Sequence, residues 1–217
     1  MNDEIKTVSL AESVFKRLES DILSGKYAIG EIITELSLTR ELSVSRTPVR
    51  EAIRRLVQEN LVEETPKGHV VAGVSYADIC DIYDIRIKIE GEATARFTKV
   101  ATEEQLHRMR EVLELQEFYT QRAEADKIKA LDSEFHEIIY SGCGSKMYGY
   151  ILSSLHRKVQ NSRRHSVSDT ERAQCAAKEH RELFSAIESR NAERAQELAV
   201  LHIKNAKDNI MKKIAEE

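Results

Sequence analysis

Four side chains in the second half of the chain are of the types that bind transition metals. Asp132 and His136 are four residues apart, so they share one face of a helix. His180 and His202 each lie on an apolar helical stripe nearer the C-terminus. Imidazole nitrogens with one carboxylate suit zinc, nickel, manganese or iron and leave positions on the ion open. On spacing alone a second interpretation stands beside this one, in which the histidines pack in a core and Asp132 pairs with a lysine or an arginine.

A second set of side chains could contact nucleic acid. Arg46, Arg50 and Arg54 recur on one side of a predicted helix. Ser45 or Thr47 can cap that helix with its hydroxyl, because the first amides of a helix lack intrahelical partners. An arginine fork on guanine discriminates a base pair by roughly 1 to 3 kcal/mol. The alternative is a solvated charged face, which is what most arginine-rich helix surfaces are.

The residues around this helix predict a winged helix-turn-helix. A short leucine-rich segment, 36–42, precedes the helix across a tight turn. After the helix, apolar residues in 61–63 and 69–71 flank the turn residues Pro66 to Gly68, which predicts a two-stranded wing. We therefore expect a DNA-binding domain over residues 6–74.

The rest of the chain predicts an all-helical second domain. Both prolines precede residue 75, and the remainder is rich in Ala, Leu, Glu, Lys and Arg. Capping and turn residues divide it into six predicted helices: 77–99, 102–124, 125–140, 145–166, 169–190 and 192–213. The expected fold is mostly α, with an N-terminal winged helix-turn-helix followed by an all-α bundle over residues 77–213.

Composition limits the classes of protein to consider. The net charge of -4 gives no overall electrostatic attraction for nucleic acid, so the prediction of DNA binding depends on the local arginine cluster. The three cysteines are widely spaced and form no CxxC pair, which argues against a disulfide framework or a zinc ribbon. The first residues are polar and no apolar run could span a bilayer, so we expect a cytoplasmic protein without a membrane partner.

The segment Ser45 to Ala52 resembles the winged-helix domain of the GntR family of bacterial transcription regulators. This resemblance implies five DNA-contacting residues: Ser45, Arg46, Thr47, Arg50 and Gly68. In the family the two arginines and the threonine contact operator bases and phosphates. The serine is expected to cap the helix and to donate to phosphate, and the glycine lies at the minor groove. Asn60 departs from the family pattern, which usually has glycine there.

Three further motifs resemble the FadR-type branch of that family, whose helical effector-binding domain is called FCD. These motifs are Asp132 to His136, Glu179 with His180, and Leu201 with His202. The resemblance implies that the aspartate and the three histidines bind a divalent metal ion, with zinc first and nickel, manganese or iron as alternatives. Arg86 and Glu90 also stand where this branch has an arginine and a glutamate. A guanidinium such as Arg86 or Arg163 could hold the far end of a carboxylate bound to the ion.

Together these observations predict a sequence-specific repressor and not an enzyme. We expect a homodimer that binds a pseudo-palindromic double-stranded DNA operator and responds to a small organic acid. The alternative from another class is a metal-dependent hydrolase that uses the Asp/His cluster, with Glu134 or Glu179 as base. The sequence offers no second carboxylate-rich motif or nucleophile for that chemistry. His156 shares a helical face with apolar residues and is a further histidine that could reach the interior.

Overall fold

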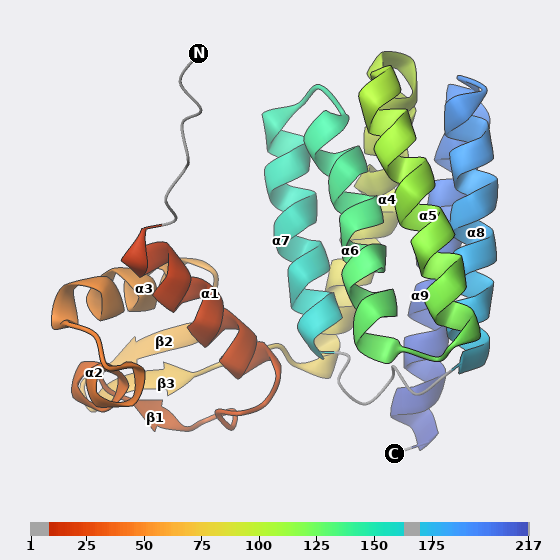
Figure 1. The fold of residues 1–217 in the computed structure, drawn as a ribbon. Helices are drawn as coiled ribbons and strands as arrows, with labels where there is room; N and C mark the ends of the chain where they lie inside the picture. Colours follow the sequence, from red (N-terminus) through yellow and green to blue (C-terminus); the bar gives the residue numbers. More distant parts are fainter. Residues whose placement is uncertain (1–8, 163–169, 217) are drawn as a thin grey trace, which may run out of the picture. The chain divides into compact units, whose positions relative to one another are not determined.

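The computed structural model describes residues 9–162 and 170–216 and divides the chain into two compact units, Met1–Ser75 and Tyr76–Glu217 (Figure 1). Within the described part, the first unit contains these elements: α1 (Leu10–Leu23), β1 (Ile32–Ile33), α2 (Glu35–Leu42), α3 (Arg46–Gln58), β2 (Val62–Thr65) and β3 (Gly68–Val71). The predicted mostly helical fold with an N-terminal winged helix-turn-helix is confirmed.

Helices α1 and α3 build most of the core of the first unit. Along α3, Val49, Ile53 and Leu56 are fully or almost fully buried, and they alternate with exposed arginines at the helical period. Leu18 of α1 is also fully buried in this core. Ser43 ends α2 in the left-handed conformation at φ 53°, which produces the tight turn before α3.

The wing is a tight hairpin with one more strand than predicted. Strands β2 and β3 pair antiparallel from Val62 opposite Val71 to Thr65 opposite Gly68, so two residues form the turn. Within the described residues, β1 adds a third strand by pairing with β3. The sequence analysis did not anticipate β1, because two residues are too short to show a strand period. Asn60, which replaces the usual glycine, has φ 56°, a conformation that asparagine tolerates better than most residues.

The described part of the second unit consists of helices, as predicted. They are α4 (Tyr76–Val100), α5 (Glu103–Gln121), α6 (Ala125–Gly142), α7 (Lys146–Ser162), α8 (Thr170–Glu188) and α9 (Ala192–Glu216). The predicted ends near residues 166 and 169 lie outside the described residues. None of the helices in 9–162 and 170–216 is long and apolar enough to cross a membrane.

The helices of the second unit pack around one core. α4 packs mainly against α9, while α5, α6 and α7 stand side by side (Figure 1). Phe97, Met109, Phe135 and Leu183 are among the buried side chains where these helices meet. Thr102 and Gln105 form the capping box that starts α5, with Thr102 Oγ1 accepting from Gln105 N at 3.2 Å. This packing aligns the inward faces of α6, α8 and α9.

Candidate metal centre and DNA-contacting surface

Three histidines from three helices meet in the interior of the second unit. His136 of α6, His180 of α8 and His202 of α9 are at most 5% exposed, and one ring nitrogen of each lies within 4.8 Å of the others. The Nε2 atoms of His180 and His202 are 3.3 Å apart. Ligands at about 2.0 to 2.1 Å from a tetrahedral ion are separated by about 3.3 Å. The spacing of this pair therefore suits a shared ion.

The Nδ1 atom of each of these three histidines lies within hydrogen-bond distance of a side-chain oxygen. Nδ1 of His180 is 2.9 Å from Oε1 of Gln116, and Nδ1 of His202 is 2.7 Å from Oε2 of Glu179. Nδ1 of His136 lies 3.0 Å from Oε1 of Glu90. Such acceptors fix the tautomer, so that the Nε2 lone pairs remain for a metal. The donor set and its supporting contacts fit a divalent transition metal.

Asp132 lies beside this cluster. Its hydrogen-bond partner is a glutamine, whereas the interpretation without a metal expected a lysine or an arginine. Its Oδ1 is 3.9 Å from Nε2 of His180, and its Oδ2 accepts a hydrogen bond from Gln160 of α7. Oδ2 is also 3.8 Å from Nε2 of His156. The structure therefore brings Asp132, His136, His180 and His202 together, with Gln160 holding the carboxylate.

Burial and hydrogen bonds shift the pKa values of His180, His202 and Glu179. It lowers the pKa of His180 well below the ordinary value, and it lowers that of His202 although Glu179 opposes the shift. Burial opposes ionisation of Glu179, but its hydrogen bonds from His202 and Arg172 outweigh this and lower its pKa to about 2. Neutral imidazoles are the form that binds metal, so the site is prepared for an ion near neutral pH.

A cavity of about 100 Å³ opens beside the cluster. Asp132, His136 and His202 form part of its wall, together with side chains from α4, α7 and α8. One ordered water needs only about 10 to 15 Å³ by the same kind of measure, so a small organic molecule has room.

Of the two arginines expected at the effector, Arg86 lies in the cavity wall and is almost fully buried. Its Nε and one Nη bind both oxygens of Glu90 at 2.9 and 3.2 Å, and the same Nη is 3.2 Å from the Tyr140 hydroxyl. Burial opposes ionisation of Glu90, but Arg86 and His136 outweigh it and lower the pKa of that carboxyl. Arg163 lies outside the described residues.

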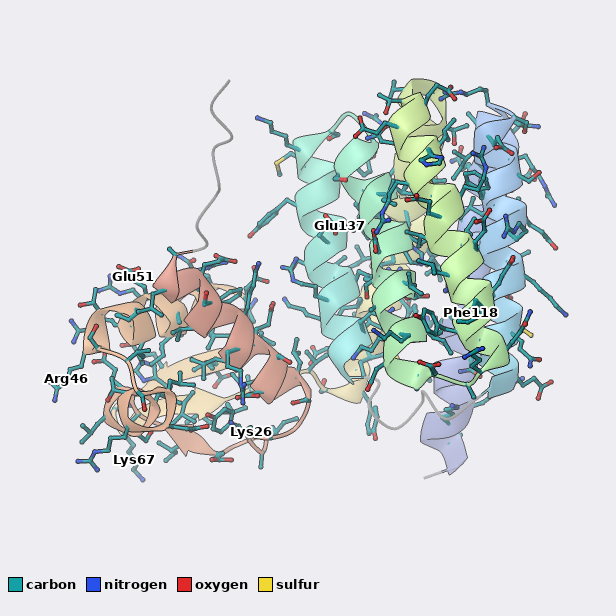
Figure 2. All side chains as sticks on the ribbon, viewed as in Figure 1. Lys26, Arg46, Glu51, Lys67, Phe118 and Glu137 are labelled. Carbon is teal, nitrogen blue, oxygen red and sulfur yellow. The ribbon has the colours of Figure 1, made fainter. Side chains whose placement is uncertain are left out.

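On the first unit, the residues expected at DNA are exposed at the start of α3. Ser45, Arg46, Thr47 and Arg50 all lie at the surface, and Figure 2 shows Arg46 extending away from the ribbon. Ser45 occupies the N-cap position, but its hydroxyl makes no capping bond to any described residue, so the predicted cap is wrong in that respect. The hydroxyl remains available for a phosphate.

Arg50 has a partner that the sequence analysis missed. Its Nε and Nη2 bind the two carboxylate oxygens of Glu35, on α2, at 2.9 and 3.0 Å. The Arg50 hydrogen bonds lower the pKa of Glu35. This fork-to-fork pair fixes the arginine side chain on the surface that would meet DNA.

Gly68 begins β3 and has φ 130°, so a side chain there would be strained. A Cβ atom would also approach Ile32 Cγ2 at 3.2 Å. The tip of the wing is formed by Pro66 and Lys67, and Figure 2 shows Lys67 extending outward. Lys67 is a second residue that the sequence analysis missed, and it could contact a phosphate.

Known proteins resemble both units. A family model described as "FCD domain" matches residues 81–205, and one described as "Bacterial regulatory proteins, gntR family" matches residues 10–70. The uncharacterized HTH-type transcriptional regulator YdhC of Bacillus subtilis (strain 168) is 27% identical over 190 residues, 87% of this chain and 85% of that protein. The gluconate operon transcriptional repressor of the same organism is 32% identical over 135 residues, 62% of this chain and 56% of that protein. The solved structure of E. coli McbR/YncC has the same fold, with a TM-score of 0.81 at 20% identity over 96% of this chain and all of that one.

The fold and these matches define a DNA-binding transcription regulator with a separate helical domain. The chain belongs to the gntR family of bacterial regulatory proteins and carries an FCD domain. It is a regulator and not an enzyme, so the hydrolase interpretation of the Asp/His cluster is set aside.

Proposed function

We propose that this regulator is a repressor whose operator affinity is controlled by a small carboxylate bound at a metal ion in the helical unit. The DNA-binding domain would span residues 6–74 and the effector-binding domain residues 77–213. The observation that carries the proposal is the convergence of one ring nitrogen from each of three histidines, together with an oxygen atom within 3.0 Å of Nδ1 of each ring.

The metal ligands in this proposal are Asp132, His136, His180 and His202. Zinc is the first choice because imidazole with one carboxylate suits it, and nickel, manganese and iron are alternatives. A bound ion would supply a Lewis acid with open positions, to which a carboxylate can bind. Arg86, in the wall of the same cavity, binds Glu90 through Nε and Nη2, and the N–H groups of its other Nη would be left for the acid.

Control of DNA binding requires that the effector favour one arrangement of the protein over another. A tenfold change in operator affinity needs only about 1.4 kcal/mol of coupling. The gluconate operon repressor, one of the relatives, is named for a carboxylate. The word gluconate in that name supports a carboxylate as the class of effector, and the word repressor supports repression of transcription by the bound protein.

The DNA site in this proposal consists of Ser45, Arg46, Thr47, Arg50 and Gly68. A single winged helix contacts a short half-site, so we expect a homodimer on a pseudo-palindrome, acting in the cytoplasm where bacterial DNA lies. Selection of binding sites from a random duplex library should therefore recover an inverted repeat.

The metal part of the proposal is tested by elemental analysis of the purified protein. Wild type should contain about one divalent ion per chain, and His180→Ala should lose it. His107→Ala is the matched control, because the side chain of His107 is 69% exposed and lies outside the cluster. Absence of any ion after incubation with zinc, nickel and manganese salts would overturn this part.

The DNA part is tested by fluorescence anisotropy on the selected duplex. Arg46→Ala should weaken operator binding roughly 5- to 150-fold, because one arginine contact to a base contributes about 1 to 3 kcal/mol. Arg96→Ala, which removes an exposed arginine from α4, should leave the affinity unchanged. Equal affinities for wild type and Arg46→Ala would contradict the assignment of α3 as the DNA-reading helix.

A further inference from the structure

His156 of α7 is a buried imidazole in the wall of the cavity. The residue is 6% exposed, and neither Nδ1 nor Nε2 has a partner among the described residues. Leaving a buried polar group unpaired is energetically costly, so buried imidazoles are almost always hydrogen-bonded. A polar molecule in the cavity could pair with these nitrogens, which have no partner in the part of the chain that the structure describes.

The unpaired ring forms part of the cavity beside the candidate metal ligands. Its centroid is 4.8 Å from that of the His136 ring, and Nε2 is 3.8 Å from Oδ2 of Asp132, beyond hydrogen-bond distance. His156 does not belong to the group of nitrogens that converge within 4.8 Å. It therefore lies beside the three converging histidines, next to the cavity that a molecule bound to the proposed ion would fill.

We propose that His156 recognises a hydroxyl group of the effector, so that the cavity selects acids that carry a hydroxyl close to the carboxylate. This inference rests on the proposed function, since the carboxylate is expected at the ion. His156 is then a specificity residue and not a metal ligand.

A hydroxyl matches His156 better than other small polar groups do. A neutral imidazole has one donor and one acceptor, and a hydroxyl can both donate and accept. A hydroxyl can therefore pair with whichever ring nitrogen faces the cavity, in either tautomer. A carboxylate can pair only with the N–H, and an ammonium only with the unprotonated nitrogen. The cavity of about 100 Å³ has room for a small acid, which keeps a hydroxyl near the carboxylate within reach of the ring.

Several other polar side chains in the cavity wall have protein partners. The guanidinium of Arg86 binds Glu90, and that of Arg172 binds both oxygens of Glu179 at 2.9 Å. The amide of Gln160 donates to Asp132. Within the described residues, the buried polar atoms of this wall that have no partner are the two ring nitrogens of His156, which makes His156 the candidate to recognise a second polar group on the acid.

The test is calorimetric titration of the metal-loaded full chain with two pairs of acids that differ by one hydroxyl, lactate against propionate and malate against succinate. Wild type should bind the hydroxylated member at least tenfold more tightly. In His156→Phe this ratio should fall at least fivefold, while propionate binding and metal content stay unchanged. His156→Gln, which keeps a donor and an acceptor, should retain part of the preference. His107→Phe serves as the control because it replaces an exposed histidine elsewhere on the unit.

A second measurement needs no variant that might weaken the fold. The ring ¹⁵N signals of His156 in the metal-loaded wild type should shift with lactate and not with propionate. Equal shifts with both acids would overturn the proposal, and so would a hydroxyl preference that His156→Phe leaves intact. Loss of the metal in both His156 variants would make the residue a ligand and also overturn it.

If none of the four acids binds, the hydroxyl proposal fails. The metal content and the operator affinity of the same samples report separately on the proposed function, so the two failures are distinguishable.

Discussion

At the scale of single residues, the ion pair between Arg50 and Glu35 fixes one arginine of the proposed DNA-reading surface in the DNA-free protein. The Arg50 side chain is 53% exposed, and its bidentate partner fixes the direction of the guanidinium. The same carboxylate adds negative charge to a surface that must approach phosphates. Glu35 should therefore raise specificity while lowering general affinity for DNA.

Glu35→Gln separates these two effects. We expect roughly 3- to 10-fold tighter binding to a scrambled duplex, because a repulsive charge next to the phosphates is removed. The ratio of operator to scrambled affinity should fall, because Arg50 loses its bidentate support. Anisotropy titrations of both duplexes at two salt concentrations measure this. Glu63→Gln, which removes another exposed carboxylate, is the control, and an unchanged ratio would show that Glu35 does not position Arg50.

Gln116 is a second single residue with a predictable effect. It accepts from Nδ1 of His180 at 2.9 Å and is 1% exposed. Gln116→Leu should keep the volume but lower metal affinity about 10- to 100-fold, the usual effect of removing a supporting acceptor. Competition for zinc with a chromogenic chelator gives the affinity. An affinity equal to that of wild type would mean that the orientation of His180 is set by packing alone.

At the scale of elements, a polar chain joins the end of α1 to α2. Lys26 Nζ lies 2.8 Å from Oδ2 of Asp21 and 2.6 Å from Oε1 of Glu41, and Arg17 binds the same oxygen of Asp21. Burial opposes ionisation of Asp21, but the hydrogen bonds from Lys26 and Arg17 outweigh it and lower its pKa. These contacts stabilise the position of the helix that precedes α3.

Asp21→Asn should lower the free energy of unfolding of the first unit by about 1 kcal/mol at pH 7. The pKa of Asp21 is lower in the folded than in the unfolded state. Its contribution is therefore full above the unfolded value of about 3.9 and is lost as the pH falls through the folded value. Urea unfolding followed by circular dichroism at pH 7 and pH 3.5 gives the difference in the free energy of unfolding between wild type and Asp21→Asn at each pH. A difference that is as large at pH 3.5 as at pH 7 would contradict the role of the ionised carboxylate.

At the scale of the whole molecule, the candidate metal site joins three helices that are distant in sequence. A ligand that binds only the folded state stabilises it by about 4 kcal/mol at a thousandfold excess over its Kd. That stabilisation applies to the helical unit, because the ligands all come from α6, α8 and α9.

Zinc should therefore raise the Tm of the helical unit by about 10 °C relative to chelator-treated protein. The Tm of the winged-helix unit should not change, since none of the proposed metal ligands lies in that unit. Differential scanning calorimetry with and without EDTA measures both transitions. An equal shift in both, or in neither, would show that the ion does not bind at the histidine cluster.

The amino-acid sequence by itself determined the features that depend on local order. The arginine helix after Ser45, the hairpin around Pro66 and the helices of the second unit follow from caps, turn residues and apolar periods within short windows. The inward placement of His136, His180 and His202 also follows from those periods, because a helical stripe fixes which residues face a core.

Only the tertiary structure decided which residues support the sites. Gln116 and His180 are 64 residues apart, and Glu35 and Arg50 are 15 apart on different helices. The pairing of β1 with β3 and the ring of His156, which has no partner within residues 9–162 and 170–216, likewise became visible only in the folded chain. These contacts join side chains across packed elements, so no periodic pattern encodes them, and the geometry of packing selects the partners.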